Sequence, residues 1–223
     1  MAKAPKRTTY TAPKGVLSWP KLTTPDTKFK PEGEYSVGLV LPANSPEAQA
    51  FKKKIDAAAA ESLAAAKANA KNPAEAKRWE TKYVPYKMLE DKETGEPTGE
   101  IEFKFTMKAS GVSKKTGKPW TRKPALFDAR GTALGEGIEV GGGSVAIIAY
   151  QLAPYSQTPQ SGASVKLALE AVQILELRTY GQKNASAFGF QAQDGFTADS
   201  STNEESDEEG TEDDGETPTD GDF

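Results

Sequence analysis

The clearest pattern along the chain is a strict alternation of apolar and polar residues, which is typical of β-strands with one buried face. Residues 34–41 and 100–108 both show it. Their apolar positions are Tyr35, Val37, Leu39 and Leu41 in the first stretch, and Ile101, Phe103, Phe105 and Met107 in the second. We therefore predict a half-buried strand over each range.

Further strands are expected at residues 16–22, 83–89, 144–152 and 165–177. Pro20 interrupts the first of these ranges, and 144–152 is apolar on both faces, as in a buried strand. In 165–177 the large apolar residues occupy odd-numbered positions up to Leu169, and the next one, Val172, occupies an even-numbered position. A shift of this kind predicts a β-bulge, which small barrels use where a strand bends.

Two helix starts stand between the early and the later strands. Ser45-Pro46-Glu47 supplies an N-cap, a proline at the first helical position and an early acid, so we predict a helix to Ala70. Its apolar face, formed by Phe51, Ile55, Leu63 and alanines, is too small for an independent core and should pack on a sheet. Asn72-Pro73, with Glu75 placed as in a capping box, predicts a second short helix that carries Trp79.

Turn-forming residues separate the later strands, at 91–99 and at the basic hairpin tip 114–118. About five strands with one helical insertion suit a mainly β fold, an OB-fold (a five-stranded Greek-key barrel). We expect a flexible basic arm over residues 1–14, this barrel domain over 15–190 and a disordered acidic tail over 191–223.

The charge distribution divides the chain into two electrically different parts. All 28 Lys and Arg residues lie within residues 1–183, where they accompany 19 of the 32 acidic residues, so this part carries a charge of +9. The other thirteen acids lie from Asp194 onward without a base. A basic body favours a polyanionic partner, whereas an acidic tail can imitate that polyanion or contact proteins.

The composition excludes several kinds of chemistry. The chain has no His and no Cys, which excludes Ser-His-Asp and Cys-His catalysis, zinc sites with the usual ligands, haem, iron–sulfur clusters and disulfides. No apolar run approaches the length of a membrane span, and the N-terminus lacks the apolar stretch of a secretory signal. We expect a soluble cytoplasmic protein with no bound metal or cofactor.

Cations and aromatic residues interleave along the basic part, as single-stranded nucleic acid requires: cations follow the phosphates and exposed rings stack on bases. The alternative is that strand aromatics such as Phe103 and Phe105 face the core and that the lysines are solvated. We weigh Trp120, beside a turn, evenly between groove wall and core. The predicted DNA-binding residues are Trp19, Lys28, Lys30, Tyr83, Tyr86, Lys87, Lys104, Lys114, Lys115, Lys118, Trp120, Arg122 and Lys123.

Two other functions are considered. Glu102-Phe103-Lys104, with Asp91 upstream, matches the acid-x-Lys element of magnesium nucleases, which needs two carboxylates for the metal and a lysine near the attacking water. The alternating pattern favours a solvated strand face instead. A chaperone for basic proteins, with the tail as its binding site, is a third hypothesis. The glycine clusters at 131–137 and 141–143 lack the spacing of phosphate-binding loops, so nucleotide hydrolysis is not expected.

The tail ends in Thr219-Asp220-Gly221-Asp222-Phe223. Acidic tails often serve solubility alone, but a terminal aromatic residue after a long polar stretch is typical of a docking tip for a basic, apolar pocket. The predicted partner-binding residues are Asp213, Asp214, Asp220, Asp222 and Phe223.

Five stretches, taken in order and together with the terminal aromatic residue, resemble the T7-like phage single-stranded-DNA-binding proteins. They are 28–35 (KFKPEGEY), 99–105 (GEIEFKF), 126–129 (LFDA), 142–144 (GGS) and 171–175 (AVQIL). The resemblance implies a non-enzymatic OB-fold that coats single strands during DNA replication, recombination and repair in the cytoplasm of an infected bacterium. It also implies that the tail occupies the DNA groove when no strand is present, and that it contacts replication proteins such as DNA polymerase and helicase/primase. A homodimer is left open.

Overall fold

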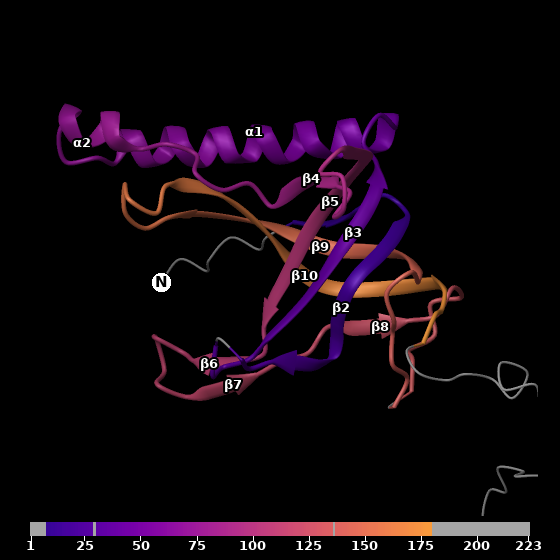
Figure 1. Cartoon of the computed structure of the whole chain (residues 1–223). Helices are drawn as coiled ribbons and strands as arrows, with labels where there is room; N and C mark the ends of the chain where they lie inside the picture. The colour runs from indigo at the N-terminus through magenta and orange to yellow at the C-terminus, as the bar shows by residue number, and fades with distance from the viewer. Residues whose placement is uncertain (1–7, 29, 136, 180–223) are drawn as a thin grey trace, which may run out of the picture. The chain divides into compact units, whose positions relative to one another are not determined.

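The computed structural model describes residues 8–28, 30–135 and 137–179. The elements along the chain are β1 (Thr9–Thr11), β2 (Gly15–Asp26), β3 (Glu34–Pro42), α1 (Pro46–Ala68), α2 (Pro73–Arg78), β4 (Tyr86–Glu90), β5 (Pro97–Lys108), β6 (Ser110–Val112), β7 (Pro119–Thr121), β8 (Ala125–Phe127), β9 (Val145–Ser156) and β10 (Ala163–Glu176). The strands outnumber the two helices, as the alternating pattern predicts (Figure 1).

Five of the strands close into a barrel. β2 pairs with β3, and β3 with β5, in antiparallel fashion. β5 then pairs in parallel with β10, β10 pairs antiparallel with β9, and β9 returns to β2 at Gly15 and Val16. This closed circuit, in the order β2-β3-β5-β10-β9, is the strand order of an OB-fold, so the predicted fold class is confirmed.

The core of the barrel consists of the apolar positions that define the sequence pattern. In the β3–β5 register, Val37 lies opposite Phe105 and Leu39 opposite Phe103, and all four side chains are buried. The polar positions between them therefore face outward. β10 changes its register with β9 between Leu169 and Ala171, so the predicted bulge is confirmed at that place.

Helix α1 lies across one end of the barrel (Figure 1). It begins as predicted, because the Ser45 side chain accepts a hydrogen bond from the Ala48 N–H (3.2 Å) and Pro46 occupies the first turn. Phe51 inserts into the barrel end, with ring centroids 4.5 Å from Phe103 and 5.4 Å from Tyr150. The helix therefore depends on the sheet, as its small apolar face predicts.

Helix α2 is shorter than predicted at its C-terminal end. Asn72 caps it by accepting from the Glu75 N–H (2.8 Å), but the Glu75 carboxylate accepts from the Lys71 N–H, one residue before the position that a capping box requires. Trp79 lies just beyond the helix as its C-cap, and its side chain is buried against Ala66 and Ala163.

The N-terminal region differs from the expected flexible arm over residues 1–14. Thr9–Thr11 form β1, which pairs with β9 from Gln151 to Ala149, and Ala12 is buried. The Tyr10 ring packs 5.8 Å from Tyr150 and lies under the Lys54 ammonium group at 3.2 Å. These long-range contacts order the second half of the segment. The expected domain boundary at 190/191 lies outside the described residues.

β2 continues through Pro20 to Asp26 instead of ending near Leu22. Its register with β3 shifts between Ser18 and Lys21, where Pro20 offers no N–H for pairing. Neither described helix combines the length and hydrophobicity that a membrane crossing requires.

Candidate nucleic-acid interface

Two adjoining depressions run over the outer face of β2, β3 and β5. The first lies beside Trp19, and the second lies between the β2–β3 loop (27–33) and the β9–β10 loop (157–162). They share Tyr83, Pro85 and Lys104, so they form one continuous surface, which we call the groove. In OB-folds this strand face, with the loops that flank it, is where oligonucleotides bind.

The floor of the groove is formed by outward-facing residues of β3 and β5. Because these strands alternate, Glu102, Lys104 and Thr106 point away from the core. On β3 the corresponding residues are small: Ser36 and Gly38. A Cβ atom at Gly38 would overlap the Ser18 hydroxyl and the Glu102 carboxylate, so the close approach of these groups requires glycine there.

Trp19 is the most exposed aromatic residue among those described, with 75% of its surface accessible. It lies at the β2 irregularity and has a φ of +44°, a conformation that side-chain-bearing residues rarely adopt. The bulge turns the indole out of the barrel and onto the edge of the groove. The Lys92 ammonium group, from the β4–β5 hairpin, lies 5.8 Å from the ring centroid. The ring therefore offers a face on which a base can stack.

Tyr83 stands where the two depressions meet, and 45% of its surface is accessible. The segment that carries it is held against β5 because the Lys104 N–H donates to the Pro85 carbonyl (2.8 Å). Burial raises the pKa of the Tyr83 phenol, so the ring is neutral near pH 7. It offers a second stacking surface.

Tyr86 lines the first depression as a fixed wall residue. Its hydroxyl donates to the Asp56 carboxylate (2.6 Å), and its ring lies 6.0 Å from the buried Phe103 ring. Burial first, and then the hydrogen bond to Asp56, raise the pKa of this phenol. The Tyr86 ring is thus less free to stack than Trp19 or Tyr83.

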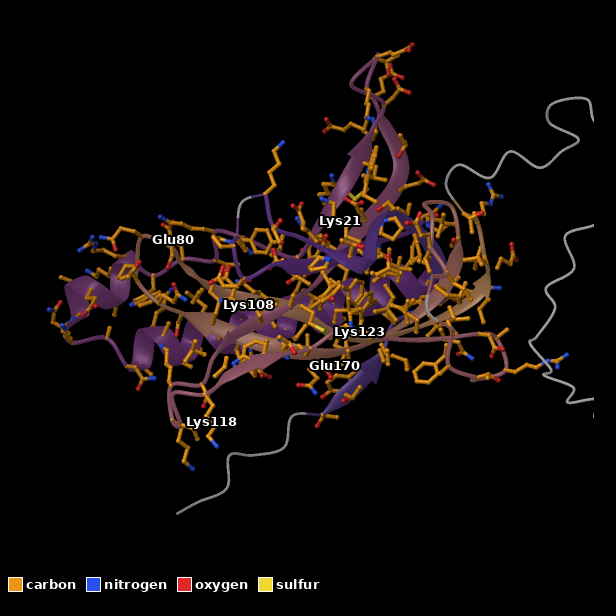
Figure 2. The ribbon with its side chains drawn as sticks, turned by 90° about the horizontal axis from the view of Figure 1, so that it is seen from below. Lys21, Glu80, Lys108, Lys118, Lys123 and Glu170 are labelled. Atoms are coloured by element: carbon orange, nitrogen blue, oxygen red, sulfur yellow. The ribbon has the colours of Figure 1, made fainter. Side chains whose placement is uncertain are left out.

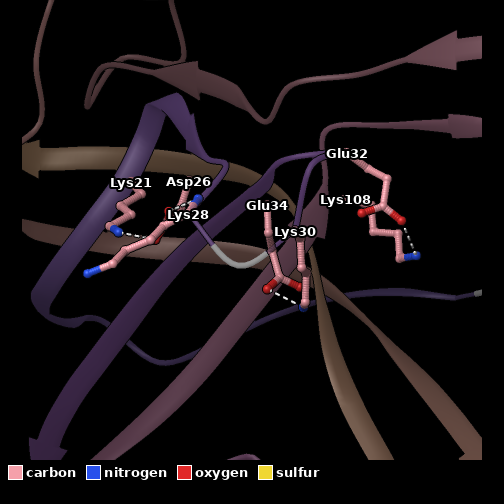
Figure 3. A network of polar contacts seen from close by, with 7 residues as sticks. All are labelled: Lys21, Asp26, Lys28, Lys30, Glu32, Glu34 and Lys108. Atoms are coloured by element: carbon pink, nitrogen blue, oxygen red, sulfur yellow. Dashed lines mark hydrogen bonds and ion pairs between the residues drawn. The ribbon is translucent and has the colours of Figure 1, made fainter.

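Lysines surround the groove, and several are held by carboxylates (Figure 3). Lys30 pairs with Glu34 (2.5 Å), Lys21 with Asp26, and Lys108 with Glu32 (4.0 Å), all next to the β2–β3 loop. The hydrogen bond from Lys21, and then that from the Lys28 N–H, lower the pKa of Asp26.

Two further lysines complete this arrangement. Lys87 pairs with Glu102 (3.0 Å) in the first depression, and Lys104 is exposed in both depressions. The pairs of Lys21, Lys30 and Lys108 are more exposed to solvent and therefore weak, so these lysines are available for exchange onto phosphates.

The β6–β7 hairpin carries the other predicted basic residues on a separate two-stranded sheet. Lys114, Lys115 and Lys118 are exposed near its tip, and Figure 2 shows Lys118 at the projecting end. Trp120 is half-buried over Gly111, with the Arg122 guanidinium 5.2 Å from its ring. None of these residues lines the groove.

The hairpin nevertheless adjoins one end of the groove. The Ser110 hydroxyl donates to the Glu32 carbonyl (2.8 Å), and the Ala109 N–H donates to the Gly33 carbonyl (2.9 Å). These contacts join the base of the hairpin to the β2–β3 loop, which flanks the second depression. Lys123 follows β7, and Phe29 lies outside the described residues.

The residues of the nuclease hypothesis are engaged elsewhere. The Asp91 carboxylate accepts from the Glu93 and Thr94 N–H groups (2.9 Å each), and the Thr94 bond is the larger cause of its lowered pKa. Glu102 accepts from the Ser18 hydroxyl and pairs with Lys87. In the part of the chain that the structure describes, no group of three or more His, Cys, Asp or Glu side chains is arranged to hold a metal ion. The geometry gives this hypothesis no support.

Three cationic or aromatic groove residues are absent from the sequence-based prediction: Lys21, Tyr155 and Lys166. The Lys166 ammonium group lies 5.4 Å from the Tyr155 ring centroid, at the β9–β10 end of the second depression. The place of Tyr155 and Lys166 in the groove follows from the pairing of β9 with β10, which no local sequence pattern contains. The tail residues Asp213, Asp214, Asp220, Asp222 and Phe223 lie outside the described residues.

Comparison with known proteins gives consistent matches. Residues 10–177 match the family model described as "Single-stranded DNA-binding protein, Bacteriophage T7". The single-stranded DNA-binding protein of enterobacteria phage T3 is 33% identical over 213 residues, which cover 93% of this chain and 91% of that protein. Its counterpart from Escherichia phage T7 is 32% identical over 201 residues, or 86% of each chain. The crystal structure of the T7 protein, gp2.5, superposes with a TM-score of 0.62 at 28% identity, covering 87% of this chain and all of that one.

Proposed function

The chain belongs to the family of bacteriophage T7 single-stranded DNA-binding proteins, and we propose that it binds single-stranded DNA along the groove, without catalysis and with little sequence preference. The observation that carries this proposal is the exposure of Trp19 and Tyr83 beside Lys104 on the face between the two flanking loops. The rings can stack on the bases of a single strand, and the cations can follow its phosphate backbone.

In this mechanism Trp19 and Tyr83 stack on bases, each stack contributing about 1–3 kcal/mol. Lys21, Lys30 and Lys104 neutralise phosphates, so the logarithm of the binding constant falls with the logarithm of salt concentration by about 0.7 for each phosphate contacted. Stacking is sequence-tolerant because every base has a π-face. Duplex DNA hides those faces within its own stack and should bind much more weakly.

The other DNA-binding predictions belong to this proposal as an extension of the groove. The cations of the β6–β7 hairpin, which meets the β2–β3 loop, would contact phosphates of a strand leaving the second depression. Lys28 and Lys87 would act in the same way from the β2–β3 loop and from β4. Trp120, half-buried under Arg122, would support the hairpin rather than stack on a base.

We assign the tail two roles, one from its acidic charge and one from its terminal aromatic residue. Its thirteen acids compete with DNA for the lysines of the basic part, and its terminal Phe223 contacts proteins of phage DNA replication, such as polymerase and helicase/primase. Tethered to the same chain, the tail acts at an effective concentration of about millimolar. DNA would displace it and leave it available to these partners in the host cytoplasm.

The test uses fluorescence anisotropy with a labelled oligothymidine and a matched duplex. Trp19→Ala should weaken oligothymidine binding by about 5- to 100-fold, because one stack is lost. Lys104→Ala should weaken it and make its salt dependence shallower by about 0.7.

The control is Lys53→Ala, which removes an exposed cation from α1 outside the groove. It should bind like the wild type apart from a small change in net charge. Equal affinity of both groove variants and the wild type would exclude the groove as the site. Equal binding of the duplex would contradict the stacking mechanism, and magnesium-dependent degradation of the DNA would contradict the absence of catalysis.

A further inference from the structure

The first depression contains a carboxylate. Glu102 lies on the outward face of β5 and lines this depression together with Trp19 and Lys104, and its side chain is only 13% exposed. A carboxylate is unexpected at the floor of a surface that is to receive a polyanion. Its position therefore requires an explanation.

The surrounding strands hold this carboxylate in one place. The Ser18 hydroxyl of β2 donates to one Glu102 oxygen, and the Lys87 ammonium group of β4 lies 3.0 Å from the other. Gly38 of β3 leaves the space that this contact needs. Lys87 is 67% exposed and can turn toward solvent, whereas the 13% exposed Glu102 side chain is enclosed by its neighbours on the floor.

The phosphates and the bases of a single strand interact differently with the Glu102 carboxylate. A phosphate on the floor would lie within a few ångströms of the carboxylate, where like charges repel strongly in a partly desolvated site. A base is neutral, and its N–H groups can donate to a carboxylate. The cations Lys21 and Lys104 and the rings of Trp19 and Tyr83 lie in the same depression.

We propose that Glu102 sets the orientation of the bound strand: it excludes the sugar–phosphate backbone from the floor, so that bases enter the groove and phosphates stay with the lysines at its rim. This inference rests on the proposed function and makes Glu102 a specificity-determining residue. Polyanions without bases gain no stacking and also meet the repulsion. The groove thereby rejects them in favour of single-stranded nucleic acid.

The experiment compares two ligands of equal length and charge, an oligothymidine and the corresponding abasic deoxyribose-phosphate oligomer, in competition with a labelled oligothymidine. For Glu102→Gln in the full chain, we expect the affinity for the abasic oligomer to rise about tenfold, because the repulsion is removed. The affinity for oligothymidine should change less than about threefold, since its bases rather than its phosphates lie on the floor. The selectivity ratio therefore falls.

Two further variants separate this effect from general charge and from folding. Glu61→Gln makes the same change in net charge on the exposed face of α1 and should leave the ratio unchanged. Glu102→Asp keeps the charge with a shorter side chain and should keep the wild-type ratio, even where thermal stability falls.

The outcomes are distinguishable. Failure of the wild-type protein to bind oligothymidine overturns the proposed function itself. If the wild type binds it but Glu102→Gln keeps the full selectivity ratio, Glu102 only links the strands and the inference is wrong. Equal effects of Glu61→Gln and Glu102→Gln would also overturn it.

Discussion

At the scale of single residues, Trp19 combines two features that oppose stability. Its indole is exposed, and its backbone lies in the left-handed region although proline follows it. Conformations of this kind raise the energy of the folded state by about 1–3 kcal/mol and persist only where the surrounding structure fixes them. Here the paired parts of β2 on both sides fix it. The sequence pattern places Trp19 near a strand end but contains no signal for its positive φ.

Tyr150 supplies a prediction about alkaline stability. The side chain is 1% exposed, and burial raises the pKa of its phenol from 10.0 to about 12. Because the folded-state pKa is raised, the protonated phenol stabilises the fold fully below pH 10, and this contribution is lost as the pH rises toward 12. Tyr150→Phe should therefore retain more of its unfolding free energy between these values than the wild type. Urea unfolding at pH 9 and pH 11 measures the difference, and an identical loss in both proteins would contradict the assignment.

At the scale of elements, the segments with a strong local signal were predicted well. Residues close together in the sequence determine three features: the alternation of β3 and β5, the Ser45 cap of α1 and the bulge of β10. No strand was predicted over residues 9–11, because the order of β1 comes from β9 and from the contact of Tyr10 with Lys54, which no local pattern contains. Tyr155 and Lys166 were missed for the same reason, since their relation to the groove appears only when β9 and β10 join the barrel.

The β6–β7 hairpin supports a prediction about salt dependence. Its exposed lysines extend the cationic surface beyond the β2–β3 loop. Replacing Lys114, Lys115 and Lys118 with Gln should reduce the steepness of the salt dependence for a long oligothymidine by about 2, at about 0.7 for each lost phosphate contact.

The matched control for the hairpin replaces three exposed lysines of α1 and α2, Lys53, Lys67 and Lys77, with Gln. It changes the net charge equally and should leave the slope near that of the wild type. Equal slopes in the two triple variants would place the hairpin outside the DNA path.

At the scale of the whole molecule, the groove is lined by residues from six strands and three connecting segments, which the closed barrel brings together. Local patterns predict the strands, but the order in which they pair depends on contacts distant in sequence. The OB-fold order was expected from about five strands with one helical insertion, and the family resemblance implied the same fold. The division into a basic part and an acidic tail, by contrast, is fully visible in the sequence.

This division predicts the effect of removing the tail. A chain ending at Ala192 keeps all 28 basic residues and loses thirteen acids, so its net charge changes from −4 to +9. Its affinity for oligothymidine at low salt should exceed that of the full chain by at least about tenfold, because a tethered competitor is lost. The advantage should shrink as salt screens both interactions. Titration of the intrinsic tryptophan fluorescence at several salt concentrations measures this, and equal affinities at low salt would exclude competition by the tail.

The barrel is closed by two short pairings, that of β5 with β10 and that of β9 with β2, each of two residue pairs. The β5–β10 pairing is parallel. It comprises Leu167 opposite Phe105 and Ala168 opposite Thr106, whereas β9 and β10 pair along most of their length. The second depression lies over this β5–β10 pairing, since Lys104 and Thr106 line it from one side and Lys166 and Leu167 from the other. A DNA strand lying there would bridge one of the two shortest pairings of the barrel. Amide hydrogen exchange at the paired residues of β5 and β10 should therefore slow when DNA binds, because the bound strand stabilises the part of the barrel on which it lies.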